Sequence, residues 1–236
     1  MPGSDQLIPK IELLGEDALL VHFGNSIDAD LNTRVHALAR RIESVRPAWL
    51  RDIAPSYASL ALFVDLDVFR PTLDALDEAT TWLRQVLVGE EFIGRMGEGR
   101  LVEICVHYGG EDGPDLEALA THAGLSTIQV IERHVAVEYR VAMLGFAPGF
   151  PYLLGLDPAL AMPRLQTPRT RVAAGSIGIG GDQTGIYPRS GPGGWRIIGC
   201  TTQALFDPHR DPPSLLAAGD RVRFVAVDYF GEDALL

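Results

Sequence analysis

The N-terminal part of the chain shows two kinds of hydrophobic pattern in turn. Short apolar segments interrupted by turn residues cover 10–23 and 49–66, which predicts two pairs of short β-strands. After each pair, apolar residues recur every three or four positions. This spacing predicts one helix ended by Pro47 and a second helix capped by Thr72 and ended by Gly89. The order predicts an α+β domain whose helices pack on one antiparallel sheet.

A segment without periodicity follows and separates two domains. Residues 90–100 hold three glycines and five charged residues, so we interpret them as a linker. A chain of 236 residues has room for two small domains. We therefore predict an α+β domain over 1–92 and a second domain over 93–236.

The second domain carries short strand patterns and two small helices. Asp115 stands where it would cap the first helix. Ser126 and Gln129 have the spacing of a capping box for the second, with Ile128 and Ile131 on its inner face. Short strands with few helices predict a closed, mainly β barrel. The clearest predicted strands are 101–108, 138–144 and 220–228.

The centre of this domain, residues 145–199, has an unusual composition. It holds 12 of the chain's 25 glycines and 7 of its 16 prolines, together with many large apolar residues. Because proline interrupts helices, we predict tight turns and short strands here. The segment has five arginines and two acidic residues, whereas the whole chain has a formal net charge of −11. A cationic, glycine-rich surface predicts a site for an anionic group, and an arginine-covered barrel wall is the alternative.

Composition excludes several classes of protein. The acidic balance argues against a nucleic-acid partner. Neither a signal-peptide pattern nor an apolar run of membrane-spanning length occurs, so we expect a soluble cytoplasmic protein without a membrane partner. Cys105 and Cys200 form no disulfide framework and no zinc spacing, and both are expected to be buried thiols.

The chain also lacks the residues that several common chemistries require. Lys10 is the only lysine, so a P-loop, a Schiff-base lysine and the Ser-Ser-Lys triad of amidases are excluded from the rest of the chain. The glycines of 175–182 do not have dinucleotide-binding spacing, and no cluster has metal-ligand spacing. Ser176 is a candidate nucleophile outside a G-x-S-x-G motif. His134 is a candidate general base, or a helix-terminal histidine that contacts its own last carbonyls.

Several segments in fixed order resemble the family of carboxyltransferase-domain subdomains C and D. The resemblance extends over most of the chain from about residue 101, and the N-terminal part fits in length and element order. The segments are VHYGGEDGPDL at 106–116, GFAPGFPYLLGL at 145–156, PRLQTPRTRV at 163–172, AGSIGIGGDQTGIYP at 174–188, PGGWRIIG at 192–199 and LFDP at 205–208.

This resemblance implies a fold and a set of activities. It implies a ferredoxin-like α+β domain followed by a cyclophilin-like β-barrel. The family includes a subunit of ATP-dependent 5-oxoprolinase, which opens the lactam of 5-oxoproline to L-glutamate. It implies ATP as co-substrate, a sister subunit with a similar barrel (subdomains A and B) and a third subunit. Two alternatives are an inhibitor that binds a sensor histidine kinase, and half of a complex that metabolises urea or allophanate.

The resemblance also assigns roles to the candidate residues. Arg164 and Arg169 would bind phosphate and carboxylate, because guanidinium groups hold planar oxyanions through two hydrogen bonds. Gln183 and Tyr187 would orient a substrate amide, beside the candidates His134 and Ser176. Backbone N–H groups would form an anion nest at Gly175, Gly178, Gly180 and Gly181.

Four positions depart from the family pattern. Ala173 replaces a usual proline, Gly191 a serine, Cys200 an arginine and Thr202 a proline. Loss of an arginine and a hydroxyl at a candidate anion site is expected to weaken or redirect activity.

Overall fold

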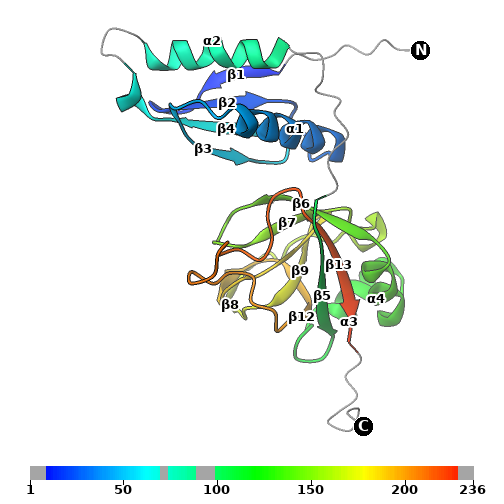
Figure 1. The fold of residues 1–236 in the computed structure, drawn as a ribbon. Helices are drawn as coiled ribbons and strands as arrows, with labels where there is room; N and C mark the ends of the chain where they lie inside the picture. The colour runs from blue at the N-terminus through cyan, green and yellow to red at the C-terminus, as the bar shows by residue number, and fades with distance from the viewer. Residues whose placement is uncertain (1–8, 70–73, 89–98, 228–236) are drawn as a thin grey trace, which may run out of the picture. The chain divides into compact units, whose positions relative to one another are not determined.

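The computed structural model divides the chain into two compact units, residues 1–97 and 98–236 (Figure 1). The predicted boundary after residue 92 and most of the predicted linker at 90–100 lie outside the described residues, so this boundary stays a prediction. Thr72 and Gly89, the predicted ends of the second helix, lie outside them too. The residues that the structure describes are 9–69, 74–88 and 99–227.

The N-terminal unit is a four-stranded antiparallel sheet with two helices, as the hydrophobic pattern predicts. The strand order is β1-β2-β4-β3. Asp28 caps the first helix, because its carboxylate accepts hydrogen bonds from the backbone N–H groups of Asp30 and Leu31. The elements are β1 (Lys10–Leu13), β2 (Ala18–His22), α1 (Ala29–Val45), β3 (Leu50–Pro55), β4 (Ser59–Val64), a 3₁₀ turn η1 (Leu66–Val68) and α2 (Ala75–Val88).

One core holds this unit together. Leu19 and Val21 of β2 lie beside Leu62 and Leu60 of β4, and all four are fully buried. Side chains from α1 and α2 belong to the same apolar cluster, so both helices cover this one face of the sheet. The element order is ββαββα, which differs from the βαββαβ order of a ferredoxin-like domain, so that finer prediction is not confirmed.

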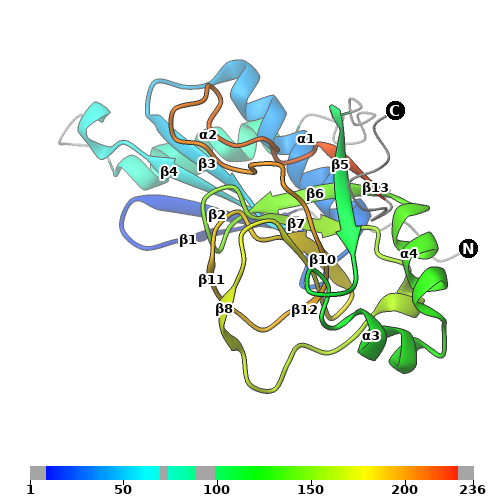
Figure 2. The same cartoon turned by 90° about the horizontal axis from the view of Figure 1, so that it is seen from below.

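The C-terminal unit is a closed barrel, as predicted, and the barrel has seven strands (Figure 2). The strand order is β10-β7-β6-β13-β5-β12-β9, in which only the β5–β13 pair is parallel. A separate ribbon of β8 and β11 accompanies it. The elements are β5 (Leu101–Tyr108), α3 (Leu116–Ala123), α4 (Thr127–Val135), β6 (Glu138–Leu144), β7 (Pro151–Leu154), a 3₁₀ turn η2 (Pro158–Leu160), β8 (Arg169–Val172), β9 (Ser176–Gly180), β10 (Gln183–Ile186), β11 (Gly191–Gly193), β12 (Arg196–Cys200) and β13 (Arg221–Ala226).

Side-chain alternation gives strand β9 two different faces. Ile177 and Ile179 belong to the main apolar core that fills the barrel. Because successive side chains of a strand point to opposite faces, Ser176, Gly178 and Gly180 face outward. The outer face of β9 therefore carries three small residues in a row, and it is this face that positions the candidate site.

Three local predictions are corrected by the structure. Asp115 precedes α3, but its side chain forms no capping hydrogen bond, because its carboxylate contacts Arg169 and the backbone of β12 instead. The capping box of α4 is confirmed, although Ile128 is 66% exposed, and Val130 and His134 occupy the inner face. Cys105 is exposed and Cys200 half-buried, so the predicted burial of both thiols is wrong.

Cys105 is exposed because side chains alternate between the two faces of β5. Its neighbours Ile104 and Val106 on β5 point into the barrel core and are fully buried. Cys105 lies between them in sequence and therefore points outward.

Candidate functional site

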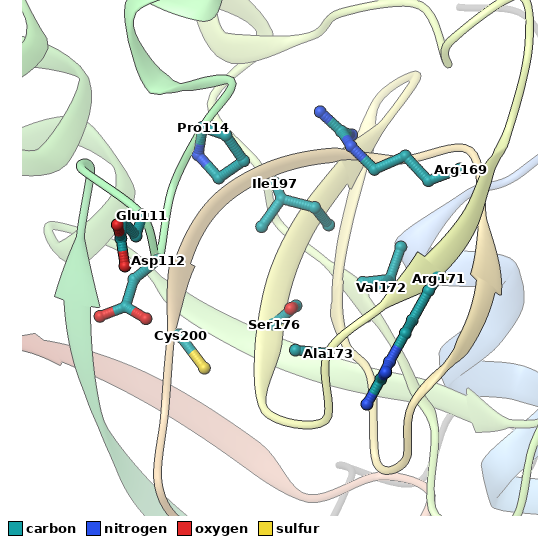
Figure 3. Close-up of a pocket in the computed structure, with 10 residues that line it drawn as sticks. All are labelled: Glu111, Asp112, Pro114, Arg169, Arg171, Val172, Ala173, Ser176, Ile197 and Cys200. Carbon is teal, nitrogen blue, oxygen red and sulfur yellow. The ribbon is translucent and has the colours of Figure 1, made fainter.

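A cleft of about 210 Å³ lies over the outer face of β9 and β12 (Figure 3). Ten residues line it, from the loop before α3, from β8 and the residues that follow, and from β9 and β12. Gly113 allows the loop to approach β12, since a Cβ atom at this position would lie 2.2 Å from the carbonyl oxygen of Ile198. The central segment therefore builds the cleft together with the separate loop 109–114.

Charged groups of both signs face this cleft. Glu111 and Asp112 lie on one side of it, and Arg169 and Arg171 on the other (Figure 3). Neither carboxylate has an ion-pair partner among the described residues. Arg171 donates a hydrogen bond through Nε to Ser190 Oγ at 3.1 Å. The cleft is therefore dipolar, whereas the arginines of the central segment predicted a cationic surface.

Arg169 is largely occupied by a neighbouring carboxylate. Its guanidinium lies 2.8 and 2.9 Å from the two oxygens of Asp115, whose side chain is 9% exposed. The Asp115 carboxylate also accepts a hydrogen bond from the backbone N–H of Ile197 at 2.7 Å. The hydrogen bond with Asp115 raises the pKa of Arg169 above its ordinary value. The pair fixes β8 against β12 and leaves Arg169 with little positive charge for a ligand.

Ser176 and Cys200 lie in the same cleft and face each other across the β9–β12 pairing. Ser176 is 4% exposed as a residue, and its side chain borders the cleft. Cys200 Sγ lies 3.6 Å from the carbonyl oxygens of Ala174 and Thr201. Burial, together with the charge of Asp112, raises the pKa of the Cys200 thiol, so this thiol is a weak nucleophile at neutral pH.

An aromatic cluster continues the same outer face beyond the cleft. The Trp195 indole lies against Gly180, where a Cβ atom would stand 2.6 Å from its ring, and the Trp195 Cβ atom lies near Gly178. Tyr187 packs close to Gly193, since a Cβ there would lie 2.4 Å from its hydroxyl oxygen. Two of the glycines predicted as an anion nest, Gly178 and Gly180, thus make room for aromatic side chains. The cluster consists of Phe150, Val172, Tyr187, Trp195 and Ile197, with Ala147 and Tyr152 beside it.

The backbone of the predicted nest is already hydrogen-bonded. Gly175 donates its N–H to the carbonyl of Tyr187 at 2.7 Å, and Gly181 donates to Met162 at 2.8 Å. Gly178 and Gly180 belong to β9, which pairs with a neighbouring strand on each side. These N–H groups are therefore poorly placed to hold an anion.

Two other predicted residues lie at the aromatic cluster. The Arg164 guanidinium stacks over Trp195 at 5.5 Å from the ring centroid, and it forms no hydrogen bond or ion pair with the described residues. Gln183 is 3% exposed, and its Nε2 has no hydrogen-bond partner within the described ranges. Gln183 shares the outward face of β10 with Gly185, where a Cβ would lie 3.1 Å from the Trp195 ring.

Burial changes the acidity of Tyr187 in this cluster. Desolvation raises the pKa of its phenol, while a backbone hydrogen bond at Trp195 and the charge of Arg164 oppose that shift. The phenol therefore stays protonated at neutral pH and remains able to donate a hydrogen bond.

His134 lies apart from both regions, in the core of the barrel. It is fully buried and stacks on Phe224 at 4.6 Å between ring centroids. Thr184 donates its hydroxyl to the carbonyl of Gly178 at 3.0 Å, so Thr184 Oγ1 accepts from His134 Nε2 at 3.3 Å. His134 Nδ1 then accepts from the Tyr108 hydroxyl at 2.7 Å. Desolvation lowers the pKa of His134 to about 3, so its ring is neutral.

The structure thus separates the predicted residues into three groups. Arg169 and Ser176 line the cleft, Arg164, Gln183 and Tyr187 lie at the aromatic cluster, and His134 lies inside the barrel. Two positions that depart from the family pattern, Ala173 and Cys200, also line the cleft. Gly191 has open space around it, and Thr202 is exposed.

Sequence reasoning missed the acidic side of the cleft. Glu111 and Asp112 lie in VHYGGEDGPDL, a segment that carried the resemblance but received no role. Glycines and a proline around two adjacent acids were the available signal, because such a loop exposes charged side chains. Arg171 was counted with the other arginines and not singled out.

Two other features are absent from the described residues. No group of three or more His, Cys, Asp or Glu side chains is arranged to hold a metal ion. Within the same ranges, no helix has both the length and the apolar character needed to span a bilayer.

Comparison with known proteins identifies the class to which this fold and site belong. The family model of the carboxyltransferase domain, subdomains C and D, matches residues 9–216. The chain belongs to this family, as its motifs indicated.

Relatives of nearly the same length share one name. The B subunit of 5-oxoprolinase from Bacillus subtilis strain 168 is 43% identical over 224 residues, covering 92% of each chain. The B subunit of 5-oxoprolinase from Escherichia coli O157:H7 is 43% identical over 213 residues, covering 90% of this chain and 94% of that protein. The crystal structure of TTHA0988 superposes with a TM-score of 0.76 at 37% identity. That match covers 89% of this chain but 40% of the TTHA0988 chain, so the chain spans less than half of that protein.

Proposed function

We propose that this chain is a subunit of a heteromeric, ATP-dependent 5-oxoprolinase, which opens the lactam of 5-oxoproline to L-glutamate. The observation that carries the proposal is the 43% identity to the B subunit of 5-oxoprolinase over nine-tenths of both chains. The proposed partners are a sister subunit with a similar barrel and a third subunit. The finer name cyclophilin-like for the barrel belongs to the same proposal.

The aromatic cluster supplies the groups that a lactam carboxylate needs. Arg164 is held over Trp195, and its donor groups have no partner among the described residues, so we assign it the substrate carboxylate. Gln183 has a buried amide without a partner among the described residues, and we assign it the lactam amide. Tyr187 is a protonated donor beside them. Removing these groups from water would strengthen each hydrogen bond to the substrate.

The remaining predicted residues receive other roles. Arg169 positions the cleft wall through Asp115, and His134 positions barrel strands through Tyr108 and Thr184. Neither is assigned a proton-transfer step, because Arg169 is paired and His134 is sealed from solvent. Ser176 receives a role only in the cleft, which it lines.

ATP does not fit the cleft of this chain. Glu111 and Asp112 would repel a triphosphate, and Arg169 is neutralised by Asp115. The N–H groups of Gly175 and Gly181 are already donated to backbone carbonyls. We therefore propose that the nucleotide is held by a partner subunit.

The test is steady-state kinetics of the assembled complex with Arg164→Gln. We expect kcat/KM for 5-oxoproline to fall at least about tenfold, or about 1.4 kcal/mol of transition-state stabilisation. Arg84→Gln is the matched control, since Arg84 is an exposed arginine of α2. Unchanged kinetics for Arg164→Gln in an intact complex would remove Arg164 and the aromatic cluster from the substrate site.

One observation favours a second candidate function. Phe146 is 65% exposed and has φ of 66°, a backbone region in which a bulky residue is strained. An exposed aromatic ring held in this way suits a docking surface, as an inhibitor of a sensor histidine kinase would need. Phe146→Ser would abolish kinase binding under this alternative, whereas Arg164→Gln would leave it intact.

A further inference from the structure

The two sides of the cleft carry opposite charges that the protein itself does not neutralise. Glu111 and Asp112 line one side of it, and Arg171 lines the other (Figure 3). Neither carboxylate forms an ion pair or hydrogen bond with the described residues. Arg171 uses Nε for Ser190, which leaves its two terminal nitrogens available. One guanidinium and two carboxylates are thus open to a ligand, while Arg169 is satisfied by Asp115.

Ser176 gives independent support for a ligand at this position. The residue is 4% exposed, lies between the two charged sides and lines the cleft (Figure 3). Its hydroxyl has no partner in the part of the chain that the structure describes. The hydroxyl borders the cleft, so a bound group can form a hydrogen bond with it.

Charge and size restrict what this ligand is. A purely anionic molecule would be repelled by Glu111 and Asp112, and a purely cationic one would leave Arg171 unpaired. A volume of about 210 Å³ is smaller than the roughly 300–1,000 Å³ of sites for drug-sized ligands. We propose that the cleft binds an α-amino acid zwitterion, with its ammonium at Glu111 and Asp112, its carboxylate at Arg171 and a hydrogen bond to Ser176.

The identity of the amino acid rests on the proposed function. Hydrolysis of a lactam breaks the carbonyl–nitrogen bond, adds the elements of water, and leaves the nitrogen as an ammonium group. L-Glutamate therefore carries a positive charge that 5-oxoproline lacks. A dipolar cleft distinguishes the two by this charge, so it holds the product and rejects the substrate.

Isothermal titration of the full chain tests this inference. The probes are L-glutamate, 5-oxoproline and glutarate, which has the two carboxylates of glutamate without its ammonium. We expect L-glutamate to bind at least about tenfold more tightly than either other probe, a difference of about 1.4 kcal/mol. Asp112→Asn and Arg171→Gln should each weaken glutamate binding at least about tenfold.

The control variant is Glu132→Gln, which removes an exposed acid of α4 outside the cleft lining. It should bind glutamate as the unaltered chain does. Equal affinity for glutarate and glutamate would overturn the inference, and so would full glutamate affinity in Asp112→Asn. Because both cleft residues are exposed, circular dichroism is expected to show that the variants fold normally.

Failure of the inference and failure of the proposed function give different results. Phosphate release with 5-oxoproline, but no glutamate binding to the chain or the complex, overturns the inference and leaves the function standing. Ammonium-dependent glutamate binding without 5-oxoproline turnover supports an amino-acid site and removes the proposed function.

Discussion

Arg169 and Asp115 form a two-pronged ion pair, with contacts of 2.8 and 2.9 Å between the guanidinium and the two carboxylate oxygens. The same carboxylate accepts the backbone N–H of Ile197. One acid thus joins β8, β12 and the start of α3. An arginine that the motif suggests for anion binding serves here to build the wall of the cleft.

Loss of this acid is expected to destabilise the barrel. Breaking a buried ion pair costs about 3–5 kcal/mol, and we expect Asp115→Ala to cost about 3 kcal/mol because Arg169 regains contact with water. Urea denaturation at equilibrium measures the change in the free energy of unfolding. Glu132→Ala, an exposed acid of the same unit, is the control. A loss of less than about 1 kcal/mol, the range of exposed pairs, would contradict a structural role for Asp115.

His134 is expected to make stability depend on pH. Its pKa is about 3 in the folded chain and about 6.5 when unfolded. As the pH falls, the His134 ring therefore takes up a proton in the unfolded chain before it does so in the folded chain. The contribution of His134 to the free energy of unfolding is full above pH 6.5. It falls by about 1.4 kcal/mol per pH unit as the pH drops toward 3. The difference in unfolding free energy between wild type and His134→Gln should shrink between pH 6.5 and 4.

The exposed residue His209 provides the comparison for this measurement. His209→Gln should leave the pH profile of the wild type unchanged. Parallel profiles for wild type and His134→Gln over the whole range would show that His134 titrates normally in the folded chain.

Gly180 is expected to tolerate no side chain. A Cβ atom there would lie 2.6 Å from the Trp195 ring, whereas one at Gly191 meets nothing within 4 Å. Overpacking of this kind costs about 1–3 kcal/mol, so Gly180→Ala should lower the midpoint of thermal unfolding and change Trp195 fluorescence. Gly191→Ala should leave both unchanged. Equal stability of the two variants would contradict the position assigned to Trp195.

The two cysteines should differ in reactivity. Cys105 is exposed, whereas burial raises the pKa of the half-buried Cys200 thiol. Since the thiolate is the reactive form, a thiol reagent at neutral pH should modify one cysteine quickly and the other slowly. Cys105→Ser should remove the fast phase. A fast phase that persists in this variant would place the reactive thiol at Cys200.

Local patterns were sufficient to predict most elements of the fold. The capping box at Ser126 and Gln129 depends on a few adjacent residues, so it could be read directly. Ile128 and Cys105 were misplaced because burial depends on which face meets the core, and each had apolar neighbours that hid this. Asp115 has the position of a helix cap, but a partner 54 residues away in sequence holds its carboxylate.

The candidate site was predicted in part for the same reason. Glycine motifs marked the outer face of β9, but spacing does not distinguish a nest of free N–H groups from room for an aromatic ring. Gly180 shows the second case, since Trp195 fills the space above it. The acids of the cleft come from a loop more than 50 residues before Ser176, so pairing them with Arg171 required the closed barrel.

The most direct test is phosphate release by the purified partner subunits with ATP and 5-oxoproline, measured with and without this chain. We predict release that depends on both 5-oxoproline and this chain. A complex that assembles with this chain and releases no phosphate in response to 5-oxoproline would contradict its assignment as a 5-oxoprolinase subunit.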